Sequence, residues 1–210
     1  MKKTLTMVLA LVLVFALGVG GTLAWLSATT TPVVNTFTVG DINIDLNEHE
    51  YVPSTKSLAT DKKPVKTNDN YKFVPGDTLP KDPYVTVKAG SEACWLFVKI
   101  DETYNTITGL NGKVVSYEID TNVWTAVEGE ANVWYKKLDT TAADTDYNVL
   151  LNKQVTVNAD ITKTMADNTL DSAKPVLTFT AYAIQSANLK NGDVAVTTAE
   201  AAWAMVKPAN

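Results

Sequence analysis

Apolar residues recur at every second position through most of this chain, and that periodicity constrains its fold more than any other feature. The runs are rich in Val, Ile, Thr and aromatic residues, which favour extended backbone. Turn signals such as Pro75-Gly76-Asp77 and Asn191-Gly192-Asp193 separate them. Many short strands with this spacing predict an all-β protein, an antiparallel β-sandwich or jelly roll. We expect strands over residues 37–46, 84–89, 94–101, 114–119, 133–138, 155–161 and 176–185.

Two stretches depart from the strand pattern. Residues 47–71 are polar and contain Pro53, Pro64 and several Asp, Ser and Thr, which predicts a long surface excursion or flexible insertion. Near the end of the chain, Thr197-Thr198-Ala199-Glu200 has the spacing of a helix capping box, and apolar residues follow at helical intervals. We expect a short C-terminal helix that lays Trp203 on the sandwich.

The first residues have the pattern of a secretory signal peptide. Lys2 and Lys3 precede an unbroken apolar run over 7–17, and small residues lead to Thr22-Leu23-Ala24. This order predicts a signal peptide over 1–24, cut between Ala24 and Trp25, and one domain over 25–210. The alternative is an uncleaved membrane anchor, because residues 5–26 approach the roughly 20 residues that span a bilayer.

The net charge and the number of cysteines limit the partners and the bonds that this chain can form. The chain has no arginine and a formal net charge of −5, which becomes −7 once Lys2 and Lys3 leave with the signal peptide. Because the chain has no stripe of basic residues and no arginine guanidinium to bind bases or phosphates, nucleic acid is not an expected partner. Cys94 is the single cysteine, so no internal disulfide can form. It lies in a dense apolar strand, which favours a buried residue over an exposed, reactive thiol.

Two further patterns are candidate binding sites. Asp41, Asn43 and Asp45 alternate along a strand, about 6.6 Å apart on one face, which is wide for a single cation and typical of a solvated strand face. Asp139, Asp144 and Asp146 form a similarly weak calcium pattern in a Thr-rich turn. Aromatic rings could line a carbohydrate or peptide groove, but their places within strands favour core packing; they are Trp95, Trp124, Trp134, Trp203, Tyr117, Tyr135 and Tyr182.

Several motifs, in this order, resemble the family of substrates of the SipW-type signal peptidase, which includes TasA-like biofilm fibre proteins and camelysin-like surface proteins. The junction Gly20-Gly21-Thr22-Leu23-Ala24-Trp25-Leu26 precedes Val34-Asn35-Thr36-Phe37-Thr38-Val39-Gly40-Asp41-Ile42. Val74-Pro75-Gly76-Asp77-Thr78 and Thr180-Ala181-Tyr182-Ala183-Ile184-Gln185 agree with it. The resemblance implies a jelly roll, processing by that peptidase, and a place in the matrix or on the surface of Gram-positive cells, with matrix or cell-wall components as further partners.

For the fibre-forming relatives, the resemblance implies assembly by donor-strand exchange. An open sheet edge pairs with any available strand, and a head-to-tail contact propagates without closing. The segment freed by cleavage suits the role of donor strand, although Pro32 cannot donate a hydrogen bond and needs an unpaired position. An equal alternative is that this segment is an internal strand or a simple tether. The candidate donor residues are Thr29, Thr30, Thr31, Val33, Val34 and Phe37.

Camelysin-like members are described as metalloproteases, so we tested the residues for catalysis. His49 is the single histidine, and Pro53 stands where a His-Glu-x-x-His helix needs its second one. A catalytic zinc site usually has three protein ligands, mainly histidine, and a Ser-His-Asp triad would have to use His49. We therefore expect no enzyme activity and no cofactor. The expected function is a self-assembling fibre protein, and the alternative is a monomeric surface adhesin or binding module of the same fold.

Overall fold

The computed structural model describes residues 41–170 and 173–208. It divides the chain into two units, and the described residues belong to the second, Gly40–Asn210. This part consists mostly of β-strands in several antiparallel sheets, with two short α-helices, which confirms the all-β prediction. None of its helices has the length and apolarity needed to cross a membrane.

The largest sheet has four antiparallel strands in the order β12-β6-β9-β8. Its two long strands pair along their whole length, from Val176 opposite Thr103 to Gln185 opposite Cys94. Among the described strands β12 pairs with β6 alone, so its other side is an open edge. The strands are β6 (Cys94–Thr103), β8 (Thr125–Ala126), β9 (Val133–Leu138) and β12 (Val176–Gln185).

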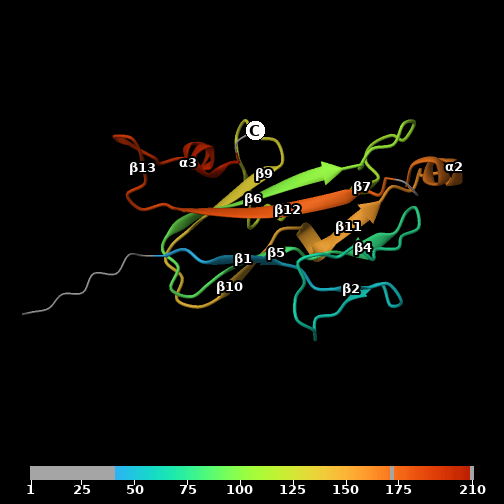
Figure 1. The fold of residues 1–210 in the computed structure, drawn as a ribbon, viewed down its shortest axis with the longest axis horizontal. Helices are drawn as coiled ribbons and strands as arrows, with labels where there is room; N and C mark the ends of the chain where they lie inside the picture. Colours follow the sequence, from blue (N-terminus) through green and yellow to red (C-terminus); the bar gives the residue numbers. More distant parts are fainter. Residues whose placement is uncertain (1–40, 171–172, 209–210) are drawn as a thin grey trace, which may run out of the picture. The chain divides into compact units, whose positions relative to one another are not determined.

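Two three-stranded antiparallel sheets, β1-β5-β10 and β4-β11-β7, complete the main body. Figure 1 shows β6, β9 and β12 along one side and β1, β4 and β5 along the other. Within the described strands β1 pairs with β5 alone, so it too has an open edge. The elements are β1 (Ile44–Asn47), β4 (Thr78–Pro80), β5 (Tyr84–Val87), β7 (Val115–Ser116), β10 (Thr145–Asn148), the 3₁₀ turn η1 (Leu151–Lys153) and β11 (Gln154–Val157).

Several shorter elements lie outside these three sheets. They are the hairpins β2 (Tyr51–Val52) with β3 (Ser57–Leu58) and β13 (Lys190–Asn191) with β14 (Val194–Ala195), and the helical segments α2 (Lys163–Met165), η2 (Ala166–Leu170) and α3 (Ala199–Val206). The turn at Pro75-Gly76-Asp77 forms as expected: Gly76 has a φ of +86°, which favours glycine, and the Asp77 amide donates to the Val74 carbonyl at 2.9 Å.

The main core fills the space between the four-stranded sheet and the sheets opposite. Leu96, Val98 and Ile100 of β6 and Val85 of β5 are fully buried within it. Cys94 is buried beside them with no exposed surface, which confirms that it packs as a small hydrophobe. Burial raises the pKa of its thiol to about 11.

A second cluster covers the other face of the four-stranded sheet. Trp203 of α3 is buried against the rings of Phe97 and Tyr182, with centroids 5.4 and 5.2 Å away. The helix begins after Thr198, whose hydroxyl accepts a hydrogen bond from the Ala201 amide, one residue later than the capping-box spacing predicts. The C-terminal helix and the packing of Trp203 on the sheet are confirmed.

The strand predictions are confirmed over 133–138 and 176–185, where β9 and β12 have the expected bounds. The run over 114–119 contains only the two residues of β7, with Ile119 in an isolated bridge to Leu150. The sequence did not predict β4, which is the three residues Thr-Leu-Pro, or β10, which is Thr-Asp-Tyr-Asn.

The polar stretch 47–71 contains the β2–β3 hairpin and is held to the body by side-chain hydrogen bonds. Tyr51 in β2 is fully buried and stacks on Tyr71, with ring centroids 4.2 Å apart. Asn68 accepts from the Tyr51 amide and donates to the His49 carbonyl, while the Asn70 amide donates to the Tyr51 carbonyl. Side-chain amides therefore hydrogen-bond to the backbone groups of this stretch, in place of the backbone of a neighbouring strand.

Candidate functional site: a groove between two open strand edges

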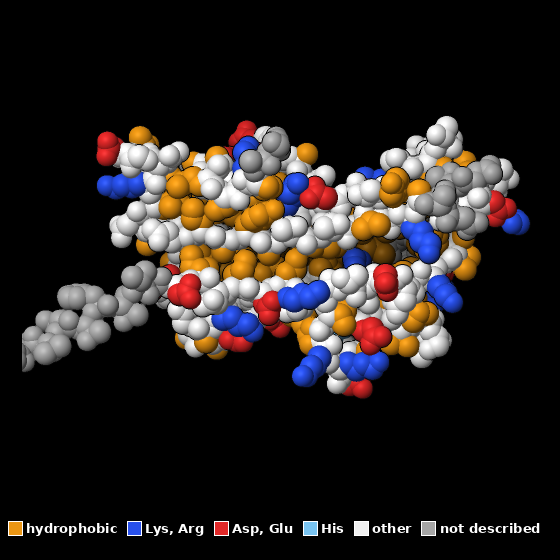
Figure 2. All heavy atoms as spheres, viewed as in Figure 1, with side chains coloured by type: hydrophobic (Ala, Val, Ile, Leu, Met, Phe, Trp, Pro, Cys, Tyr) orange, Lys and Arg blue, Asp and Glu red, His pale blue; other side chains and the backbone are white. Residues whose placement is uncertain are grey.

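A groove of about 530 Å³ lies between the open edges of β1 and β12. Figure 2 shows apolar side chains at the surface in a band between these two strands. The groove is closed at one end by residues 65–68, where the Val65 amide donates to the Glu48 carbonyl at 2.7 Å. Strand edges carry backbone N–H and C=O groups without strand partners, so an extended chain could hydrogen-bond to either edge beside the groove.

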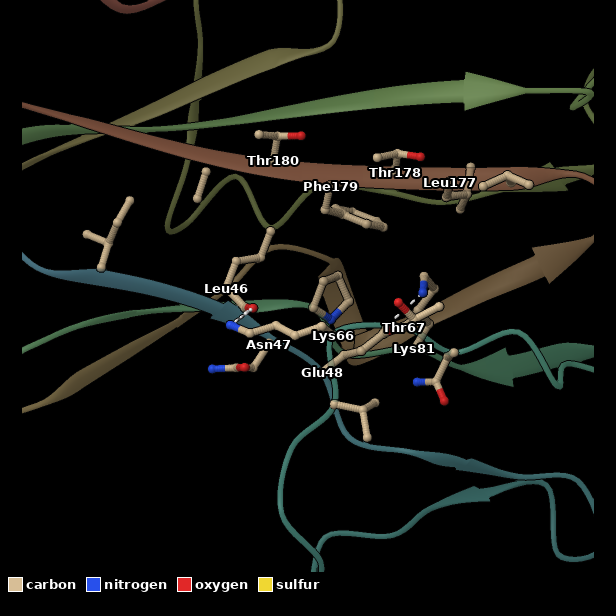
Figure 3. Close-up of a pocket in the computed structure, with 16 residues that line it drawn as sticks. Leu46, Asn47, Glu48, Lys66, Thr67, Lys81, Leu177, Thr178, Phe179 and Thr180 are labelled. Carbon is tan, nitrogen blue, oxygen red and sulfur yellow. Dashed lines mark hydrogen bonds and ion pairs between the residues drawn. The ribbon is translucent and has the colours of Figure 1, made fainter.

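The apolar lining is left half-covered where a further strand would bury it. Figure 3 shows Leu177 and Phe179 pointing from β12 toward β1, while Thr178 and Thr180 point away. Phe179 and Ala181 are half-buried, although Ile100 and Val98, their partners on β6, are fully buried. Leu46 and Ile44 of β1 are half-buried in the same way from the other side. The hydrophobic core is therefore accessible to solvent along the groove between β1 and β12.

A buried ion pair lies among these apolar side chains. The Lys81 ammonium lies 2.7 Å from Glu48 Oε2, and the two side chains are only 10% and 11% exposed. The ammonium also lies 5.4 Å from the ring centroids of Tyr71 and Phe179, within range of a cation–π contact. Burial, with Glu48 and Asp82 nearby, raises the pKa of the Tyr71 phenol, so this ring stays neutral.

His49 and Asp82 anchor the chain next to this pair. Asp82 is almost fully buried, and its carboxylate lies 2.7 Å from His49 Nδ1 and accepts the His49 backbone amide at 3.0 Å. Both residues adjoin the groove-lining Glu48 and Lys81 in sequence. The single histidine is thus hydrogen-bonded to Asp82 in the connection from β1 to β2.

The alternating acids near β1 are ion-paired or exposed. Asp41 accepts from the Asn43 amide at 2.9 Å, and Asp45 pairs with Lys66 on the rim of the groove. Asp144 pairs with Lys88, and Asp146 accepts from the Thr86 hydroxyl at 2.6 Å. Among the described residues no group of three or more acidic, histidine or cysteine side chains is placed to hold a metal ion.

The large aromatic side chains lie mainly in the core, as their places in strands suggest. Trp124, Trp203 and Trp95 are 1%, 2% and 6% exposed. Tyr135 and Tyr182 are half-buried on the outer face of the four-stranded sheet, and the Lys137 ammonium lies 4.8 Å from the Trp95 ring centroid. These rings pack in the second cluster, beside α3.

The sequence-predicted site residues lie outside the described part of the chain. These are the cleavage pair Ala24 and Trp25 and the candidate donor residues Thr29, Thr30, Thr31, Val33, Val34 and Phe37. The groove that could receive a donor was not predicted. Alternation predicted that β1 and β12 are strands, but nothing in the sequence indicated that each would have a single partner. No protein-family model, curated protein or solved structure matches the chain.

Proposed function

We propose that this chain is a secreted structural protein of the cell surface or biofilm matrix, and that its copies assemble into fibres by donor-strand exchange. The observation that carries the proposal is the groove between the open edges of β1 and β12. An extended segment placed there gains backbone hydrogen bonds and covers Leu46, Leu177 and Phe179. The arrangement of the sheets supports the finer assignment of a β-sandwich of the jelly-roll type.

The donor is the N-terminal segment over 25–38 of a neighbouring copy. Its Thr and Val residues favour extended backbone, and Pro32 takes a position where its missing N–H faces no partner. The cut between Ala24 and Trp25 by a SipW-type peptidase frees this segment, so processing is the assembly switch. Because donor and acceptor are different surfaces, the contact is head-to-tail and propagates into a filament without any catalytic step.

The test compares two purified chains by negative-stain electron microscopy under identical conditions. One begins at Trp25 and the other at Phe37, so the second lacks most of the donor. We expect filaments from the first chain and none from the second. Filaments from both would remove the N-terminal segment from the mechanism.

Monomers from both chains would favour the second candidate, a surface adhesin or binding module of the same fold. The observation behind that candidate is the outer sheet face, where Tyr135 and Tyr182 keep part of their surface exposed and the Lys137 ammonium lies over the Trp95 ring. Amphipathic rings of this kind bind sugars and peptides.

A further inference from the structure

A second pocket, of about 480 Å³, lies on the outer face of the sheet β1-β5-β10. Side chains of a strand alternate between its two faces, and Figure 3 shows Leu46 directed toward β12 and Asn47 directed away from it. Asp45, Thr86 and Asp146 lie opposite one another on the three strands and form a row across the pocket. The pocket is therefore on the other face of β1 from the groove.

The hydroxyl of Tyr84 is a hydrogen-bond donor without a partner in this pocket. Tyr84 lines the pocket from the central strand β5 and is only 8% exposed. Among the described residues nothing hydrogen-bonds to its hydroxyl, which keeps some contact with solvent. Burial, with Asp146, Asp82 and Asp45 nearby, raises the pKa of this phenol, so its proton is retained. A ligand in the pocket can therefore accept a hydrogen bond from Tyr84.

Asp146 supplies a free acceptor close to this donor. Its Oδ1 accepts from the Thr86 hydroxyl at 2.6 Å, and no group of the described residues donates to its Oδ2. Asp146 is opposite Thr86 on the neighbouring strand, which makes it the diagonal neighbour of Tyr84. Side chains at diagonal positions of a sheet are near enough to contact one small ligand.

The charges around the pocket nearly cancel, which favours a neutral ligand. Two of the three aspartates in the lining, Asp45 and Asp144, are ion-paired with lysines. The lining also contains Lys63, whose charge offsets that of the third aspartate, Asp146. A cationic ligand would meet the lysines and an anionic ligand the carboxylates, so the pocket discriminates against both.

We propose that this pocket binds a neutral sugar, a pyranose with free hydroxyl groups. Sugar hydroxyls both donate and accept, so one can accept from Tyr84 while its neighbour donates to Asp146. The volume of about 480 Å³ falls within the roughly 300–1,000 Å³ of small-molecule sites. Because the pocket and the groove lie on opposite faces of β1, this inference is independent of the donor-strand function.

The experiment titrates the processed chain 25–210 with the methyl glycosides of glucose, galactose, mannose and N-acetylglucosamine, followed by saturation-transfer difference NMR. We expect at least one of them to bind with a dissociation constant on the order of 1 mM. Tyr84→Phe removes only the hydroxyl and should weaken binding about tenfold. Tyr135→Phe, the matched control on the four-stranded sheet, should leave the affinity within about twofold.

Asp146→Asn is a second variant, which tests the acceptor and keeps the site testable if circular dichroism shows that Tyr84→Phe is unfolded. It should also weaken binding, because the amide replaces a charged acceptor by a neutral one. Glucosamine and glucuronate, which carry opposite charges, should bind more weakly than the neutral glycosides. Failure of all four glycosides to bind well above 1 mM, tighter binding of a charged sugar, or an equal loss in Tyr135→Phe would each overturn the inference. None of these results bears on filament formation.

Discussion

At the residue scale, a partly buried carboxylate forms several hydrogen bonds near the end of β6. Glu102 accepts hydrogen bonds from the Tyr117 hydroxyl at 2.7 Å, the Lys113 ammonium at 2.6 Å and the Asn105 amide at 2.8 Å. Asn105 in turn donates to and accepts from the Val115 backbone. Burial alone would raise the pKa of Glu102, but the hydrogen bonds outweigh it and hold that pKa below its usual 4.5.

Replacing Glu102 by Gln should lower the free energy of unfolding by about 1–3 kcal/mol at neutral pH. Because the folded-state pKa is lowered, the contribution is present above about pH 4.5 and is lost as pH falls through the folded value. Urea denaturation of both chains from pH 7 to pH 3 should show the difference shrinking with acid. Glu118→Gln, at an exposed position nearby, is the control, and an equal loss there would contradict the role given to Glu102.

Cys94 should be inert in the folded protein. Its side chain has no exposed surface and its pKa is raised from 9.0 to about 11, so thiolate is scarce and shielded at pH 8. Ellman's reagent should react at once in urea and slowly without it. The raised pKa also contributes stability below about pH 9 that is lost as pH rises toward 11. Fast reaction of the native thiol would show that the strand opens.

At the element scale, filament assembly should be sensitive to a charge introduced on one face of β12 only, the face toward the groove. Ala181 lies on the groove-facing side, and a lysine there reaches water only through the groove. Thr180, its neighbour, points away in Figure 3. Ala181→Lys should abolish filaments seen by electron microscopy, whereas Thr180→Lys should leave them. Filaments from both variants would place the contact elsewhere.

Long, regular elements were predictable from sequence because their pattern is local. β12 carries a period-two pattern over ten residues, β6 begins with a dense apolar run, and a Thr-capped apolar repeat predicted α3. Two-residue strands such as β2, β8 and β13 are too short for any periodicity. The stretch 47–71 looked flexible because it is polar, yet side-chain amides of Asn68 and Asn70 pair with its backbone and hold it in place.

The groove was less predictable, because it depends on which strands lack a second partner. That is a property of the topology, set by contacts far apart in sequence. Glu48 and Lys81 lie 33 residues apart, and charged residues in a strand-rich chain normally face solvent. The donor segment over residues 29–37 was proposed from the family resemblance together with a local pattern of residues that favour extended backbone.

At the scale of the whole molecule, the proposed assembly would bring like-charged copies together. The chain has a formal net charge of −5, or −7 after loss of Lys2 and Lys3, so subunits repel at long range. Raising the ionic strength from about 0.01 to 0.15 M shortens the screening length from roughly 30 to 8 Å. The critical concentration of chain 25–210 should therefore fall over this range. A rise would indicate that attractive charge contacts dominate the interface.

The most direct test of the assembly is a helical reconstruction of the filaments of chain 25–210 by electron cryomicroscopy. We expect density for an extended strand paired with the open edge of β1 or β12 of each subunit, traceable to residues 25–38 of its neighbour. An empty groove, or a groove filled by the subunit's own N-terminal segment, would contradict donor-strand exchange between copies.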